Sequence, residues 1–129
     1  MKWPLSEIRH AFGGRLIGNR TTKSAVSKAV LCLPDETIKY VTRNVWFISS
    51  PEDAWAFTFR GSDIKSQHLI ILSDELFKED DKQIKYTILH EIGHVILGHR
   101  NSIGYMQTDA EISRQEKEAD EFAKKYLKD

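Results

Sequence analysis

The sequence predicts a small α+β domain in which a three-stranded, mostly antiparallel sheet packs on N-terminal helices and on two later helices. Three apolar or alternating runs in the middle of the chain indicate the strands, and apolar residues at helical spacing flank them on both sides. The 129 residues suffice for one domain with a modest core. We therefore expect a single domain over residues 1–129, divided into a helical N-terminal segment, residues 1–44, and a core, residues 45–127.

The N-terminal segment predicts two clear helices and one weak one. Residues 5–16 carry apolar side chains at helical spacing, but glycines interrupt the pattern. Residues 22–33 place small and apolar side chains on one side, which predicts a helix. Pro34 ends this helix and can open the next one, over residues 35–43.

Three later segments have the composition and the periodicity of strands. Residues 45–49 are apolar and β-branched or aromatic, and a Ser-Pro pair follows them. Residues 54–59 alternate large aromatic side chains with small ones, which is the period of two that a strand requires. Residues 68–72 are strongly apolar and follow a turn-forming Gly-Ser-Asp stretch. These runs predict the three strands of the sheet.

A helix that carries the pattern His-Glu-x-x-His is predicted between Asp80 and Gly98. Aspartate side chains cap the start of a helix, and glycine suits the turn that ends it. At about 100° per residue, His90 and His94 leave the helix on one face, opposite its apolar side chains. Such a pair suits zinc, and Glu91 lies where it can accept a proton from a water on the metal without binding the metal itself.

Catalytic zinc usually has three protein ligands and a water, so a third ligand has to be found elsewhere. One solution places a histidine six residues after the second one with a glycine halfway, but these positions hold Arg100 and Leu97. His99 falls about 180° around the helix from His90, so we expect it to point away from the metal. The third ligand is therefore sought on the last helix.

The last helix offers a glutamate as the third ligand. Thr108 and Glu111 form a capping box that opens this helix. Glu116 falls inside its apolar stripe, where a carboxylate is costly unless it is paired or binds a cation. We expect Glu116 to complete a two-histidine, one-glutamate site for one catalytic zinc ion, and Asp120 to hold a ligand in place by accepting a hydrogen bond. The alternative for Glu116 is an ion pair with a core lysine or arginine.

Composition excludes several classes of partner. The 19 basic and 19 acidic residues cancel, which argues against a nucleic acid, whose partners carry clustered basic charge. No run reaches the roughly 18 apolar residues of a membrane helix, and the start of the chain lacks the apolar core of a signal peptide. Cys32 is the only cysteine, so we expect a cytoplasmic, reducing location and no disulfide.

The two motifs together resemble the gluzincin metallopeptidases, in which His-Glu-x-x-His is followed by a glutamate on a later helix. The tail from Glu116 to Ala123 is similar to their Glu-x-x-Ala-Asp-x-x-Ala signature, whose first glutamate binds zinc. Residues 53–57 and 69–73 resemble two strands of the membrane CAAX-processing proteases, although an aspartate replaces an asparagine and the transmembrane helices are missing. Small soluble minigluzincins resemble the chain over roughly residues 45–127.

This resemblance implies a zincin-like fold and a zinc metallopeptidase that hydrolyses peptide bonds in unfolded or flexible polypeptides. Glu91 then takes the proton of a zinc-activated water and passes it to the leaving amine. By the same resemblance an edge strand lines the rim of the cleft and pairs with the substrate. The strand residues concerned are Ala54, Trp55, Ala56 and Phe57. Gluzincins also supply a donor to the oxyanion, for which Tyr105 and Tyr126 are candidates.

Some minigluzincins are latent, with a terminal segment in the cleft, and residues 1–20 or the tail after Leu127 are the candidates here. Cys32 as a blocking thiolate ligand is a further hypothesis, set against the commoner buried free cysteine. Two other functions stay open. One is a regulatory protease that cleaves a specific repressor, since the chain also resembles ImmA/IrrE-type proteases more distantly. The other is a non-catalytic zinc-fold module that binds a protein, against which the intact Glu91 argues.

Overall fold

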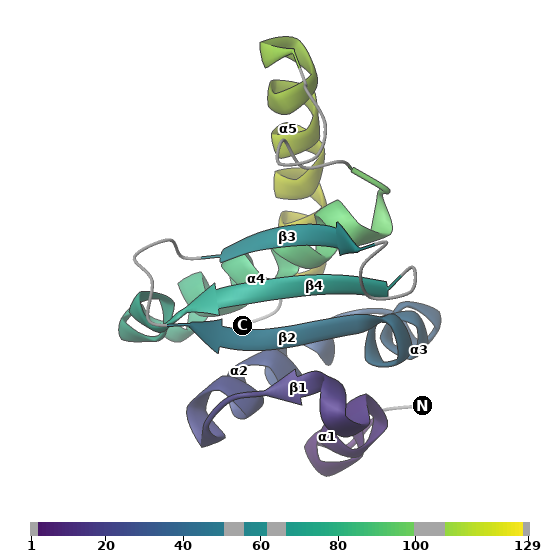
Figure 1. Ribbon diagram of the computed structural model, residues 1–129, viewed down its shortest axis with the longest axis vertical. Helices are drawn as coiled ribbons and strands as arrows, with labels where there is room; N and C mark the ends of the chain where they lie inside the picture. The colour runs from purple at the N-terminus through teal and green to yellow at the C-terminus, as the bar shows by residue number, and fades with distance from the viewer. Residues whose placement is uncertain (1–2, 51–55, 62–66, 100–107, 128–129) are drawn as a thin grey trace.

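The computed structural model describes residues 3–50, 56–61, 67–99 and 108–127 (Figure 1). One sheet forms the centre of this structure, and α2 and α4 pass along one of its faces. The elements in chain order are α1 (Leu5–Phe12), η1 (Gly13–Arg15), β1 (Leu16–Ile17), α2 (Arg20–Val30), α3 (Asp35–Asn44), β2 (Val45–Ser50), β3 (Ala56–Gly61), β4 (Gln67–Ser73), η3 (Asp74–Lys78), α4 (Asp81–Ile96) and α5 (Asp109–Tyr126).

The sheet has four strands in the order β1-β2-β4-β3. β2 is parallel to both β1 and β4, whereas β3 is antiparallel to β4. The α+β class is confirmed, but the prediction of a three-stranded, mostly antiparallel sheet is wrong in strand number and in direction. β1 was missed because two residues are too short to show a period. The chain places β3 on the far side of β4, so β2 and β4 run in the same direction.

β3 lies at the edge of the sheet. Its backbone pairs with β4 along its whole length, from Ala56 opposite Leu72 to Gly61 opposite Gln67. Within the residues that the structure describes, no strand pairs with the other side of β3. Its outer backbone groups are therefore placed to pair with an added strand.

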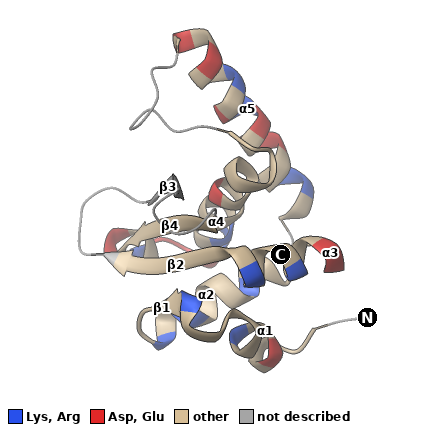
Figure 2. Ribbon diagram, turned by 45° about the vertical axis from the view of Figure 1, so that its right-hand side comes forward, with Lys and Arg blue, Asp and Glu red and all other residues tan. Residues whose placement is uncertain are grey.

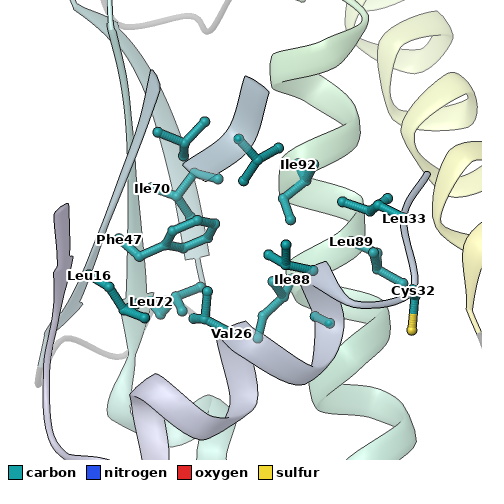
Figure 3. Packing of buried hydrophobic residues seen from close by; sticks show 14 of the residues in the cluster. Leu16, Val26, Cys32, Leu33, Phe47, Ile70, Leu72, Ile88, Leu89 and Ile92 are labelled. Atoms are coloured by element: carbon teal, nitrogen blue, oxygen red, sulfur yellow. The ribbon is translucent and has the colours of Figure 1, made fainter. Parts of the chain in front are cut away.

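The core lies between the sheet and the apolar face of α4 (Figure 3). Alternate residues of β2 and β4 are fully buried, among them Phe47 and Ile70, as the pleat of a strand requires. They face Ile88 and Ile92 of α4, which are also fully buried. The Phe12 ring closes the core from α1 by packing edge-on against Phe47, with 5.6 Å between the ring centroids. Burial of these side chains fixes α4 against the sheet. The face of α4 that carries the histidines is turned away from the sheet.

Capping side chains fix where the two later helices begin, as predicted. The Asp80 carboxylate accepts a hydrogen bond from the Gln83 backbone N–H, 2.8 Å away, at the start of α4. At the start of α5, Thr108 and Glu111 form the reciprocal capping box. These caps fix the residue at which each helix begins.

Charged side chains of both signs are interspersed along α5, while β2 and β4 carry none (Figure 2). Among the described helices, none combines the length and the apolar character that a membrane crossing requires.

Candidate metal centre

α5 approaches α4 closely because α4 has a glycine at the contact. A Cβ atom built on Gly93 would lie 3.0–3.2 Å from three atoms of Phe122, which is tighter than ordinary van der Waals contact. On the α5 side of the interface, Ala119 and Ala123 are fully buried. Small residues on both helices therefore bring the backbone of α5 within reach of the α4 side chains.

Three predicted ligands converge where α4 meets α5. His90 Nε2 lies 2.8 Å from Glu116 Oε2 and 3.2 Å from His94 Nε2. His94 Nε2 lies 3.5 Å from the other carboxylate oxygen, Glu116 Oε1. One donor atom from each residue thus falls within 4.8 Å of the other two. The two histidine side chains are largely buried, at 12% and 15% exposure, whereas Glu116 is 54% exposed.

The other ring nitrogen of His90, Nδ1, faces Asp120, one turn after Glu116 on α5. His90 Nδ1 is buried and lies 2.9 Å from Asp120 Oδ1, although off the direction of an ideal hydrogen bond. The Tyr86 hydroxyl, one turn before His90 on α4, donates a hydrogen bond to the same carboxylate oxygen. Burial and the negative charge of Asp120 raise the pKa of Tyr86 to about 12, so this hydroxyl keeps its proton at neutral pH. Asp120 therefore stands where the sequence predicted a residue that orients a ligand.

The other ring nitrogen of His94, Nδ1, faces a third histidine, His99. His94 Nδ1 lies 2.9 Å from His99 Nδ1, and His99 Nε2 lies 2.8 Å from Glu118 Oε1. Burial lowers the pKa of His94 to about 4. The negative charge of Glu116 acts in the opposite direction, whereas the imidazoles of His90 and His99 add to the lowering. His94 is therefore neutral at physiological pH, which is the form that binds a metal.

Glu91 follows His90 on α4 and is only 9% exposed. This buried carboxylate has an interaction partner, as a buried charge requires. Its shielded position beside the histidines matches the environment that a general base needs.

Glu116 reaches the cluster for a different reason from the one predicted. The residues of α5 that are buried are Gln115, Ala119 and Ala123, so the apolar stripe is rotated relative to the predicted one. Glu116 lies on the flank of that stripe and is more than half exposed. Its partners are the two α4 histidines instead of the core lysine or arginine of the alternative.

Other predicted site residues lie away from the cluster or outside the described residues. Tyr126 is ten residues after Glu116, about 15 Å along α5, and its ring packs on Phe122 with 5.0 Å between centroids. Its placement removes the basis for an oxyanion role. Tyr105 and the first two residues of the predicted edge strand, Ala54 and Trp55, lie outside the described residues. Ala56 and Phe57 open β3.

The described residues give no support to the predicted blocking groups. Cys32 belongs to the apolar core, where its sulfur lies 3.6 Å from the backbone oxygen of Lys28. Ile8 and Phe12 bury α1 in the same core, and α1 lies at the end of the molecule opposite α5 (Figure 1). Residues 1–2 and 128–129, at the two ends of the chain, lie outside the described residues.

Three contributors to the cluster were missed: Tyr86, His99 and Glu118. Tyr86 lies four residues before His90, so helical spacing contained the signal for it. His99 was predicted to point away because the helical rotation was continued to residue 99. The α-helix ends at Ile96, and the chain turns back at Gly98, whose φ is +71°. Glu118 falls outside the apolar stripe in which the sequence places Glu116, so the search for a carboxylate in that stripe did not select it.

Two imidazoles and one carboxylate on adjacent helices, with a buried glutamate directly after the first histidine, define a candidate metal site. The sequence profile of the family Peptidase U49 matches residues 54–129, which include both helices of the cluster and more than half of the chain. The chain therefore belongs to the Peptidase U49 family, a family of peptidases. No curated protein and no solved structure matches the chain.

Proposed function

We propose that this peptidase is a zinc-dependent endopeptidase that hydrolyses peptide bonds in unfolded or flexible polypeptides. One zinc ion would be held by His90, His94 and Glu116. The observation that carries the proposal is the convergence of these three side chains, with the Nδ1 atoms of both histidines facing groups that can hold them in place.

The donor atoms of the cluster suit a cation if both histidines carry their proton on Nδ1. If each histidine carries its proton on Nδ1, toward Asp120 or His99, both Nε2 atoms and the Glu116 oxygens present only lone pairs to one another. Lone pairs at 2.8–3.5 Å repel unless a positive charge lies among them. The two-nitrogen, one-oxygen donor set is typical of catalytic zinc.

The proposed chemistry is the addition of water to a peptide carbonyl. When bound, zinc lowers the pKa of a water and polarises the carbonyl. Glu91 accepts a proton as the water oxygen bonds to the carbonyl carbon, and it delivers that proton to the nitrogen as the C–N bond breaks. The Asp120 carboxylate, which accepts a hydrogen bond from Tyr86, lies 2.9 Å from His90 Nδ1. There it would hold the imidazole so that the Nε2 lone pair of His90 stays directed into the cluster.

The open edge of β3 is the proposed binding surface for the polypeptide. An extended segment can pair with its outer N–H and C=O groups, as strand addition does in many peptide-binding proteins. A folded substrate cannot offer a free strand of this kind, whereas an unfolded one can. This selects flexible polypeptides on the basis of backbone pairing.

Metal removal tests the proposal. We expect the purified chain to hold about one zinc ion and to cleave casein, and we expect a chelator to abolish both properties. Added zinc should restore cleavage, because the donor atoms are already close together without the ion. Elemental analysis and a gel assay measure the two properties. A chain that binds no zinc, or one that cleaves casein equally well after complete metal removal, would contradict the proposal.

Gly93→Ala should weaken zinc binding by forcing α5 away from α4. The new methyl group meets Phe122, which has to shift together with the helix that carries Glu116. We expect zinc affinity to fall by about tenfold, the lower end of the effect of disturbing a ligand's support. The free energy of unfolding should change by less, since alanine favours a helix over glycine by about 1 kcal/mol.

Competition with a chelating dye measures this affinity, and Gly14→Ala is the matched control. A Cβ at Gly14 meets nothing within 4 Å, so this variant should bind zinc like the wild type. Equal affinities of the Gly93 and Gly14 variants would show that the close helix contact does not govern the site.

A further inference from the structure

α4 ends in a turn that returns the chain onto its own last residues. The His99 N–H donates to the His94 carbonyl at 2.9 Å, and the Gly98 N–H donates to the Val95 carbonyl at 3.2 Å. These two bonds and the positive φ of Gly98, +71°, define a Schellman motif. In such a motif the side chains at the positions of His94 and His99 commonly make an apolar contact. Here both positions hold histidine.

One hydrogen bond joins the two imidazoles, and a second one joins His99 to Glu118. His94 Nδ1 and His99 Nδ1 are 2.9 Å apart, and their ring planes meet at 64°. On its far side His99 Nε2 lies 2.8 Å from Glu118 Oε1, on α5. The side chain of His99 is only 6% exposed, so water competes little for these bonds. Arg114, one turn earlier on α5, lies 3.5 Å from the same Glu118 oxygen.

The carboxylate at the end of this chain fixes the position of each proton. An ionised Glu118 only accepts hydrogen bonds, so a neutral His99 carries its single proton on Nε2 and leaves Nδ1 as an acceptor. His94 must then carry its own proton on Nδ1 and donate it to His99. This leaves the Nε2 lone pair of His94 directed toward His90 and Glu116.

We infer that His99 is a positioning residue for His94, and that Glu118 selects the tautomer of both. Two features thus support the second histidine, His94. The Gly98 turn places His99 beside it, and Glu118, two residues after Glu116, binds the far side of His99. This support corresponds to the one that Asp120 and Tyr86 would give to the first histidine. The statement on proton position stands alone, whereas its consequence for zinc rests on the proposed function.

Nitrogen NMR of the histidine rings tests the proton position on the full chain without metal. We expect His94 of the wild type to carry its proton on Nδ1. In His99→Phe the ring still fills the space but accepts no hydrogen bond, so the proton of His94 should move toward Nε2. The inference fails if wild-type His94 is protonated on Nε2 or if His99→Phe leaves its tautomer unchanged.

Zinc affinity, measured by chelator competition on the same proteins, tests the consequence. We expect His99→Phe to bind zinc about 10–100-fold more weakly, as is typical when the partner of a ligating histidine is lost. His99→Gln supplies an amide oxygen for His94 and an N–H for Glu118, so its affinity should lie nearer that of the wild type. His10→Phe, exposed on α1, is the matched control and should have no effect.

The outcomes separate the two proposals. If the wild type binds no zinc, the proposed function fails, while the NMR result still decides the inference about the tautomer. If the wild type binds zinc and His99→Phe binds it equally well, the positioning role is refuted and the proposed function stands. If His99→Phe does not fold, as judged by circular dichroism, His99→Gln is the deciding variant. Loss of zinc binding in folded His99→Gln, with the tautomer of His94 unchanged, refutes the role.

Discussion

Glu91→Gln is expected to retain one zinc ion per chain and to lose about 10²–10⁴-fold of its peptide hydrolysis, because it removes the general base. Glutamine has the size of glutamate, so the buried position of residue 91 stays filled and its polar contacts are partly retained. It cannot accept a proton from water at neutral pH. Initial rates on casein, with zinc content measured on the same samples, give both quantities.

The matched control is Glu121→Gln, which makes the same chemical change at an exposed position of α5. It should leave the rate unchanged. A non-catalytic module that binds a protein would be indifferent to both substitutions. Hydrolysis by Glu91→Gln at the wild-type rate would therefore remove Glu91 from the mechanism.

Glu116→Ala is expected to reduce zinc affinity by more than the roughly 10–100-fold that a supporting residue contributes, because it removes a proposed ligand. Only His90 and His94 would remain, and two ligands do not make a catalytic zinc site. Because the Glu116 side chain is 54% exposed, its loss should change the free energy of unfolding by no more than about 0.5 kcal/mol. Elemental analysis after identical purification measures the loss of zinc.

Two comparisons interpret the Glu116 result. Glu121→Ala should retain zinc, since nothing places this residue near the histidines. Asp120→Asn should retain part of the affinity, because the asparagine oxygen can also act as an acceptor beside His90 Nδ1. Full zinc content in Glu116→Ala, with the wild-type circular dichroism spectrum, would show that the third ligand is another residue.

Local sequence signals were sufficient where a physical cause acts within a few residues. Asp80 and the pair Thr108 and Glu111 predicted the helix starts that the structure shows, because capping hydrogen bonds span only three residues. Spacing along a continuous helix predicted that His90 and His94 share a face. The same reasoning failed at His99, since one glycine with a positive φ ends the helical rotation.

Strand order could not be read from neighbouring segments. β4 is apolar on both of its faces, which is typical of a central strand, but this did not say which strands lie beside it. β1 and β2 pair across about 30 residues, and no local pattern records a contact of that range. The parallel pairing of β2 with β4 follows from the place of β3 beyond β4.

The sequence by itself determined the chemical identity of the site: the types of side chain and their spacing on α4 and α5 are properties of each helix alone. Only the tertiary structure decided how these side chains meet. The contact of Gly93 with Phe122 sets the distance between the helices, and the turn at Gly98 brings His99 onto His94. Both depend on packing between segments, which spacing along one segment does not encode.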